Sequence, residues 1–174
     1  MKWASAVSEQ PGLEQAVAEC AASVRSKLGD GGPDLAVAFV SFHFEPDYGE
    51  VARLLGQNLD SAKVFGCSGG GVIGDGHEVE QRPAVSITAA SLPNVEIVDF
   101  HLDADSLPTP DAGPRSWENL VKVSEGQEPQ FVMLADPFSF PVQDLLMGLD
   151  FAFTRSAKIG GLASGAGEPG GNAL

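Results

Sequence analysis

Apolar residues recur along the chain in two patterns, one typical of amphipathic helices and one typical of buried strands. The helical pattern is clearest after Ser8 and Pro11, which favour a helix start. The apolar positions that recur there at helical spacing are Leu13, Val17, Cys20, Ala21, Val24 and Leu28. The run Asp34–Phe42 is instead continuously apolar over a strand length, which predicts a strand buried on both faces.

The same two patterns predict the other helices and strands in the first half of the chain. Lys2–Val7 predicts a strand before the first helix, and Pro46–Leu59 predicts a second helix after the buried strand. A short strand then enters a glycine-rich segment, "KVFGCSGGGVIGDG", at residues 63–76. Glycine at this density predicts unusual backbone angles or a close approach to the backbone.

The second half predicts a hairpin followed by another strand–helix–strand series. Residues 83–93 and 94–103 read as two strands joined across Leu92, Pro93 and Asn94. The Pro- and Asp-rich stretch 103–114 predicts a loop, and a short helix is expected around Trp117–Val123. The remaining predicted elements are a buried strand at Gln130–Phe138, a helix at 141–157 and the segment "KIGGLASGAG" at 158–167.

An internal repeat links the two halves. At an offset of 95 residues the identical pairs are Val37 and Val132, Pro46 and Pro141, Leu54 and Leu149, Ser61 and Ser156, Ala62 and Ala157, Lys63 and Lys158, Gly66 and Gly161, and Gly70 and Gly165. The coinciding helix lengths and glycine positions indicate a duplicated strand–helix–strand–glycine-loop unit, at about 34–71 and 130–166.

This unit predicts an α/β fold with a mixed, largely parallel sheet and helices packed on it. Loops at the carboxyl ends of such strands usually form the ligand site. Four loops qualify: "SFHFEP", "GCSGGGVIGDG", "ADPFSFP" and "GLASGAG".

Composition narrows the class of protein. With 174 residues and 43% hydrophobic content, the chain fits one globular domain, residues 1–174. The net charge of −14 argues against nucleic acid and anionic membranes as partners. No apolar stretch is long enough for a membrane span or an export signal, so a cytoplasmic location is expected. Cys20 and Cys67 stand alone, which predicts reduced thiols and neither a zinc site nor another metal or cofactor.

Two catalytic patterns overlap in the glycine-rich segment. Residues 69–74 match the GxGxxG dinucleotide pattern, and residues 66–70 match the GxSxG pattern around Ser68. His77 or His101, with Asp75 or Asp99, would complete a triad. Both patterns require a helix directly afterwards, whereas "DGHEVEQRP" follows, so neither reaction is expected.

Other candidate positions suit a binding pocket better than a reaction. Cys67 has no basic neighbour in sequence to stabilise a thiolate, so a cavity-lining role is favoured, while Cys20 belongs to the core. The alternation in "FHFE" allows His43 and Glu45 to share a face just past a strand end, where a half-exposed loop histidine is favoured over a ligand contact. A pocket role and a purely structural turn are equally open for Asp136, Phe138 and Ser139.

The stretches "KWASAVSE", "PDLAVAFVS", "FGCSGGGVIG", "AVSITAASLP" and "IGGLASGAG" together resemble the N-terminal FIST domain along essentially the whole chain. The resemblance implies a sensory domain of intracellular signal transduction that binds small ligands, with amino acids or related carboxylates proposed. It also implies a C-terminal FIST partner domain, and no catalytic residues. The strand that follows the first glycine segment has no counterpart before residue 174, so a truncated domain is expected.

The sequence therefore predicts a ligand site in which backbone N–H groups of two glycine loops bind a carboxylate. The expected ligand-binding residues are Cys67, Ser68, Gly69, Gly70, His43, Asp136, Phe138, Ser164 and Gly165. Two alternatives remain: a hydrolase or transferase that uses Cys67 or Ser68, and a protein-interaction scaffold without a ligand.

Overall fold

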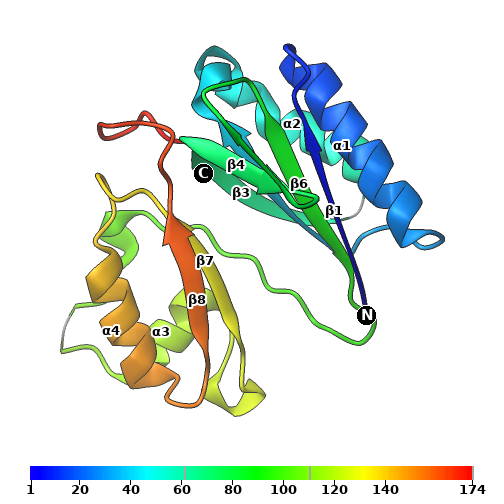
Figure 1. Cartoon of the computed structure of the whole chain (residues 1–174). Coiled ribbons are helices and arrows are strands. Elements are labelled where there is room, and N and C mark those ends of the chain that lie inside the picture. The colour runs from blue at the N-terminus through cyan, green and yellow to red at the C-terminus, as the bar shows by residue number, and fades with distance from the viewer. Residues whose placement is uncertain (61, 110, 174) are drawn as a thin grey trace. The chain divides into compact units, whose positions relative to one another are not determined.

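The chain forms two compact units in the computed structural model, which describes residues 1–60, 62–109 and 111–173 (Figure 1). The first unit comprises Met1–Ile97 together with Ala163–Leu174, and the second comprises Val98–Leu162. The first carries a mixed four-stranded sheet and the second a parallel strand pair, each with helices. The predicted α/β class is confirmed.

The sheet of the first unit has the strand order β1-β6-β2-β3. The four strands are β1 (Lys2–Ser8), β6 (Val85–Ser91), β2 (Leu35–Ser41) and β3 (Lys63–Gly69). β2 and β3 run parallel, while β6 runs antiparallel to both β1 and β2. β6 is therefore the strand that makes the sheet mixed, and β3 lies at one edge.

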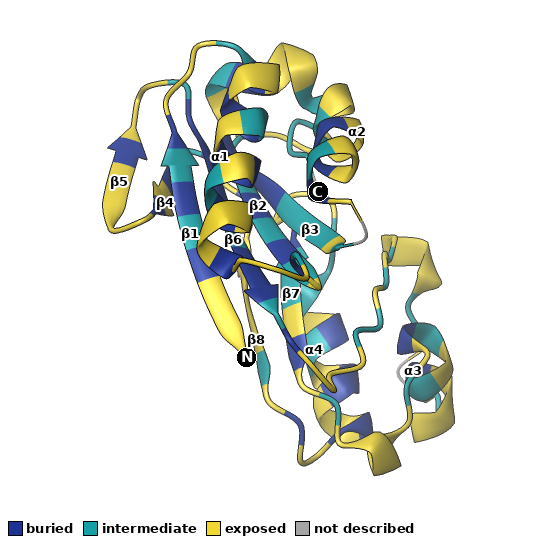
Figure 2. Ribbon diagram, turned by 90° about the vertical axis from the view of Figure 1, so that its right-hand side faces the viewer, coloured by how far each residue is buried: buried dark blue, intermediate teal, exposed yellow. Residues whose placement is uncertain are grey.

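Two helices pack on one face of this sheet. α1 (Leu13–Leu28) and α2 (Tyr48–Leu59) contact each other, and the buried side of α1 is the apolar series predicted from its spacing. Their apolar residues meet Ala36, Ala38 and Val40 of β2 in one core, which is dark blue in Figure 2. The first two residues of the helix predicted at 46–59 belong instead to a 3-10 turn, η1 (Phe42–Asp47), and α2 begins at Tyr48.

A small hairpin covers part of the opposite face. β4 (Gly71–Gly74) and β5 (His77–Glu80) pair antiparallel, and Val72 and Val79 pack against partly buried residues of the sheet. Asp75 and Gly76 form its turn with φ values of 50° and 78°, as two-residue hairpin turns require. The glycine-rich segment is therefore mostly strand, and the predicted loop is wrong except around Gly70 and this turn.

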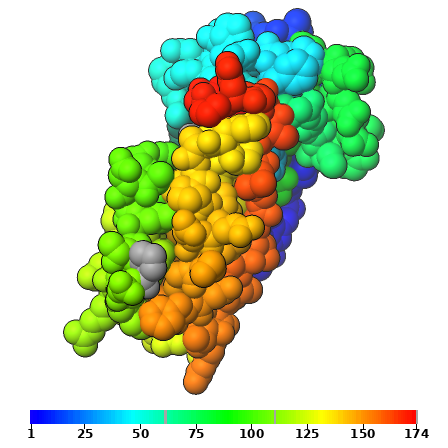
Figure 3. All heavy atoms as spheres, turned by 90° about the vertical axis from the view of Figure 1, so that its left-hand side faces the viewer, coloured from blue at the N-terminus to red at the C-terminus, as the bar shows by residue number. Residues whose placement is uncertain are grey.

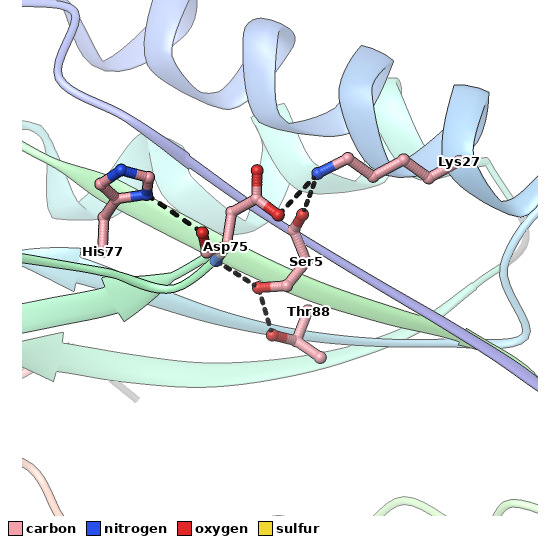
Figure 4. A network of polar contacts seen from close by, with 5 residues as sticks. All are labelled: Ser5, Lys27, Asp75, His77 and Thr88. Carbon is pink, nitrogen blue, oxygen red and sulfur yellow. Dashed lines mark hydrogen bonds and ion pairs between the residues drawn. The ribbon is translucent and has the colours of Figure 1, made fainter.

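The hairpin turn is fixed to the sheet by polar contacts (Figure 4). The Asp75 N–H donates to Ser5 Oγ at 3.2 Å, and the Ser5 and Thr88 hydroxyls are hydrogen-bonded at 3.1 Å. Lys27 Nζ lies 2.9 Å from Asp75 Oδ1 and also donates to the Ser5 carbonyl. His77 Nδ1 lies 3.0 Å from the Asp75 carbonyl oxygen. These contacts give Asp75 and His77 a structural role.

The predicted hairpin of residues 83–93 and 94–103 is wrong. Residues 85–91 do form a strand, but β6 pairs with β1 on one side and β2 on the other. Both of its edges are occupied, so residues 94–103 have no place beside it, and they form no strand.

The second unit contains a parallel strand pair with helices. Its elements are α3 (Pro114–Val121), β7 (Phe131–Ala135), α4 (Val142–Ala152) and β8 (Lys158–Leu162), with short 3-10 turns η2 (Ala104–Ser106) and η3 (Glu125–Gln127). Trp117, Phe131, Leu149 and Phe153 are at the centre of its core. The helix, strand, helix and strand predicted from 117 onward are confirmed, except that the helix predicted to reach residue 157 ends at Ala152. Pro110 of the predicted loop and Ser61 of the repeat lie outside the described residues.

Candidate functional site

Ser68 is the centre of the polar contacts at the end of β3. Its side chain is fully buried, and its hydroxyl donates to Asn172 Oδ1 at 2.8 Å while accepting from the Ala173 N–H at 3.1 Å. Its own N–H donates to the Ala173 carbonyl at 2.9 Å. The C-terminal segment 163–173 therefore binds the free edge of β3 at Ser68.

The two predicted glycine segments meet at this point. The Gly70 N–H donates to Ser164 Oγ at 3.1 Å, and the Ser164 N–H donates to the Ser68 carbonyl at 3.2 Å. A Cβ on Gly165 would lie 2.5 Å from Ser68 Oγ and 3.0 Å from the Tyr48 hydroxyl, so only glycine fits. Figure 3 shows the C-terminal residues, in red, against cyan residues of the region that includes Tyr48.

These contacts occupy backbone N–H groups that were predicted to bind a ligand. The N–H groups of Ser68 and Gly70 are bonded to the C-terminal segment, so neither is open to a ligand carboxylate in this structure. Gly69 lies within β3 and pairs with Ser41. The predicted cluster of free backbone amides is therefore not found at these two positions.

Two side chains near the carboxyl end of β2 carry buried polar atoms without a partner. Within the described ranges, neither the Tyr48 hydroxyl nor His43 Nδ1 makes a hydrogen bond of normal geometry. The His43 ring stacks on Phe42 with centroids 4.1 Å apart. Burial raises the pKa of Tyr48, although the nearby Ser68 hydroxyl partly opposes this shift. Tyr48 therefore remains a protonated donor at neutral pH.

Cys67 does not have the environment of a nucleophile. It is 7% exposed and carries a free thiol, and burial raises the pKa of that thiol to about 11. The thiolate is the reactive form, so this shift in pKa disfavours reaction of Cys67 at neutral pH. Cys20 is fully buried on α1, and burial raises its pKa to about 12, as expected for a core residue.

The other catalytic patterns also lack their required context. A short hairpin follows the glycines, where a nucleotide site or nucleophile elbow needs a helix. The described side-chain contacts of Ser68 are with the C-terminal segment and Tyr48, whereas Asp75 and His77 belong to the network of Figure 4. No group of His, Cys, Asp or Glu residues in the described ranges could hold a metal ion.

Asp136 and Phe138 belong to the second unit. Asp136 is 4% exposed, and its carboxylate accepts from the Phe138 N–H at 3.2 Å and from the Ser139 hydroxyl at 2.5 Å. This is the Asp-Pro turn chemistry expected of "ADPFSFP". The Phe138 ring is 46% exposed. Their roles in ligand binding stay predictions.

A surface pocket lies at the opposite end of the parallel strands. It is lined by Arg25, Gly31, Gly32, Pro33, Leu59 and Asp60, which flank the amino ends of β2 and β3. Arg25 and Asp60 form an ion pair of 3.5 Å there. Ligands of α/β sheets usually bind at the carboxyl ends, so the candidate site remains at Ser68.

Sequence reasoning missed Tyr48 and Asn172. Tyr48 could have been found, because it follows the predicted loop "SFHFEP" at the start of a helix. Asn172 gave no signal, because its role depends on a hydrogen bond to a residue 104 positions earlier.

The fold and this contact region define an α/β domain with a polar contact region around Ser68, at the carboxyl end of β3. The chain matches the model of the FIST N domain over residues 34–173, and it belongs to that family. The family consists of sensory domains. No helix in the described ranges has both the length and the apolar character needed to cross a membrane.

Two relatives illustrate the breadth of the similarity. An uncharacterized protein of Mycobacterium tuberculosis, Rv0628c, is 30% identical over 91% of this chain and 40% of its own length. An uncharacterized protein of Mycobacterium bovis, Mb0898c, is 26% identical over 91% of this chain and 39% of its own length. The chain thus spans about two fifths of these relatives. No solved structure gives a significant match.

Proposed function

We propose that the first unit is a sensor that binds a small polar metabolite beside Ser68, at the carboxyl end of the parallel strands. The observation that carries this proposal is the buried Tyr48 hydroxyl, which lies beside Ser68 and Gly165 but makes no hydrogen bond of normal geometry with either of them. A buried polar atom without a partner costs about 1–3 kcal/mol, and native structures rarely retain one without a reason. A ligand that accepts a hydrogen bond from Tyr48 removes this cost.

His43 supplies a second polar contact. Its Nδ1 is also buried and unpartnered in the described part of the chain, and it lies two residues after Ser41, which pairs with Gly69. Both side chains therefore come from the segment that leaves the carboxyl end of β2, where α/β folds place their ligands.

The proposed ligands are amino acids or related small carboxylates. Tyr48 donates to the carboxylate, since its raised pKa keeps its proton. Glu45 is close enough to influence Tyr48, and its carboxylate suits a ligand ammonium group. This arrangement fits a zwitterion better than a simple anion, because the protein itself carries a net charge of −14.

We further propose that binding serves signal transduction in the cytoplasm, together with a C-terminal FIST domain, and that the domain is not an enzyme. The supporting observations are the protonated Cys67 thiol and the engagement of the Ser68 hydroxyl with the C-terminal segment. Family membership supports the sensory part.

Thermal unfolding across a panel of amino acids and small carboxylates tests the proposal. A ligand at 100 times its Kd adds about 2.7 kcal/mol to the folded state, which raises the midpoint by a few degrees. The chain should be compared with Tyr48→Phe, which removes one hydroxyl. The matched control is Ser156→Ala, which removes another buried, unpartnered hydroxyl from the second unit.

We expect one chemical class to raise the midpoint of the parent and of Ser156→Ala, and to leave Tyr48→Phe unchanged. An equal shift in all three proteins would place the ligand elsewhere. Flat curves for the whole panel, in a folded parent chain, would contradict the proposed ligand class.

A further inference from the structure

The polar groups of the proposed ligand site are covered by protein atoms. The Tyr48 hydroxyl and His43 Nδ1 are buried and, in the described part of the chain, make no hydrogen bond of normal geometry. Gly165 fills the space beside the Tyr48 hydroxyl, since a Cβ there would lie 3.0 Å from the hydroxyl oxygen. A ligand that bonds to Tyr48 therefore needs the segment that contains Gly165 to move.

This covering residue belongs to the C-terminal segment 163–173, which has little apolar anchoring. The segment contains neither helix nor strand, and Ala163 alone of these described residues is buried. It lies on the face shown in Figure 3, at the red end of the colour bar. Segments with few buried apolar contacts open at a much lower cost in free energy than the core. The C-terminal segment can therefore be released without unfolding the sheet.

Hydrogen bonds at the end of β3 hold the segment in place instead. The Ala173 carbonyl accepts from the Ser68 N–H at 2.9 Å, and Asn172 Oδ1 accepts from the Ser68 hydroxyl at 2.8 Å. Ser164 Oγ accepts from the Gly70 N–H at 3.1 Å. In each of these bonds an oxygen of the segment occupies a donor of the sheet. A ligand carboxylate offers the same kind of acceptor, with a charge that strengthens the bond.

Two hydroxyl groups converge at the place that Gly165 occupies. The position of a Cβ on Gly165 is 2.5 Å from Ser68 Oγ and 3.0 Å from the Tyr48 hydroxyl oxygen. Hydrogen bonds between a hydroxyl and an acceptor oxygen span about 2.5–3.0 Å. An oxygen atom near this point would therefore be within reach of both hydroxyls, but only after Gly165 has moved away.

We propose that the C-terminal segment is a displaceable gate over the ligand site. When it is released, a carboxylate oxygen of the ligand takes the place of Gly165 and accepts hydrogen bonds from the Ser68 and Tyr48 hydroxyls. The freed N–H groups of Ser68 and Gly70 then donate to other polar atoms of the ligand or to water. The inference rests on the proposed ligand site, and it adds how that site opens and which groups bind the carboxylate.

The gate makes ligand binding and closure mutually exclusive, because both need the Ser68 hydroxyl and the space at Gly165. The ligand binds the open state, so its apparent affinity is its intrinsic affinity reduced by the open fraction. A substitution that weakens the closed segment should therefore tighten binding, whereas a substitution in the site should weaken it. Binding also leaves residues 163–173 released, which is an order–disorder change of the kind that regulatory proteins use.

Amide hydrogen exchange of the ligand-free chain tests the opening itself. Asn172→Ala removes the acceptor of the Ser68 hydroxyl. Glu168→Gln is the matched control, because this exposed side chain belongs to the same segment but not to its hydrogen bonds with Ser68 or Gly70. We expect the Ser68 and Gly70 amides to exchange about tenfold faster in Asn172→Ala than in the control, with unchanged rates in β2. Equal rates in the two variants would overturn the gate.

Acetate titration tests the binding of a carboxylate. The probe is sodium acetate, with sodium chloride at equal ionic strength as the salt control, and the readout is the shift of the Ser68 and Gly70 amide signals in NMR spectra. We expect the Kd for acetate to fall about tenfold in Asn172→Ala, to stay unchanged in Glu168→Gln and to rise in Tyr48→Phe. The Ala173 amide should exchange faster when acetate is present.

The outcomes separate this inference from the proposed function. An unchanged or higher Kd in Asn172→Ala, with a higher Kd in Tyr48→Phe, would overturn the gate and leave the ligand site in place. Slower exchange of the Ala173 amide with acetate would do the same. If acetate binds to none of the proteins, the carboxylate contacts of Ser68 and Tyr48 are wrong, and the proposed ligand class fails with them.

Discussion

Gly165 lies directly against the side chain of Ser68, although the two residues are almost a hundred positions apart in sequence. A Cβ on Gly165 would lie 2.5 Å from both Cβ and Oγ of Ser68. The contact brings the two glycine-rich segments together and orients the C-terminal segment along the edge of β3.

The first prediction concerns this contact. Gly165→Ala should lower the free energy of unfolding by about 1–3 kcal/mol, because the added methyl group overpacks against a buried side chain. Gly167→Ala is the matched control, since a Cβ there meets nothing within 4 Å. Chemical denaturation of both variants measures the difference, and equal stabilities would contradict the close packing at Ser68.

The second prediction concerns the hydroxyl of Ser68. Ser68→Ala removes the donor to Asn172 Oδ1 and the acceptor for the Ala173 N–H, at a cost of about 1–3 kcal/mol. The C-terminal segment should then be cleaved faster by proteases, and the Ala173 amide should exchange faster with solvent. Ser106→Ala, in an exposed turn, is the control. An unchanged cleavage rate at 163–173 would show that Ser68 does not hold the segment.

The third prediction is an alkaline dependence of stability. Burial raises the pKa of Cys67 from 9.0 to about 11, so the unfolded chain releases this proton at a lower pH than the folded chain. The contribution of this thiol to the free energy of unfolding is fully present below about pH 9 and is lost as the pH rises towards 11. Cys67→Ala should reduce that loss between pH 9 and 11, as measured by urea unfolding at each pH. Parallel pH profiles of parent and variant would contradict the assignment.

The fourth prediction contrasts two glycines. Gly76 has φ of 78° in the turn between β4 and β5, so Gly76→Ala should cost about 1–2 kcal/mol. Gly56 lies exposed within α2, where a Cβ meets nothing, so Gly56→Ala should add about 0.5–1 kcal/mol. Thermal melts should therefore shift in opposite directions. A shift in the same direction for both would contradict one of the two backbone assignments.

Local patterns predicted the elements whose signals lie within one segment. The apolar series from Leu13 to Leu28 predicted α1, and the continuous apolar run after Asp34 predicted β2. The hairpin at 71–80 could also have been found, because Asp75-Gly76 is a favoured two-residue turn. The glycines of residues 63–76 led to the prediction of a loop. Gly66 lies instead within β3, where only glycine fits because a Cβ would overlap the Ala38 carbonyl of the neighbouring strand β2.

The sequence by itself determined the α/β class, the helices and the buried strands, because side-chain periodicity reports directly on which face of an element is buried. The tertiary structure alone decided the partners of β6, the pairing of Ser68 with Asn172 and the unpartnered Tyr48 hydroxyl. Strand partners and buried hydrogen bonds join residues far apart in the chain, and their geometry exists only once the backbone has been brought together.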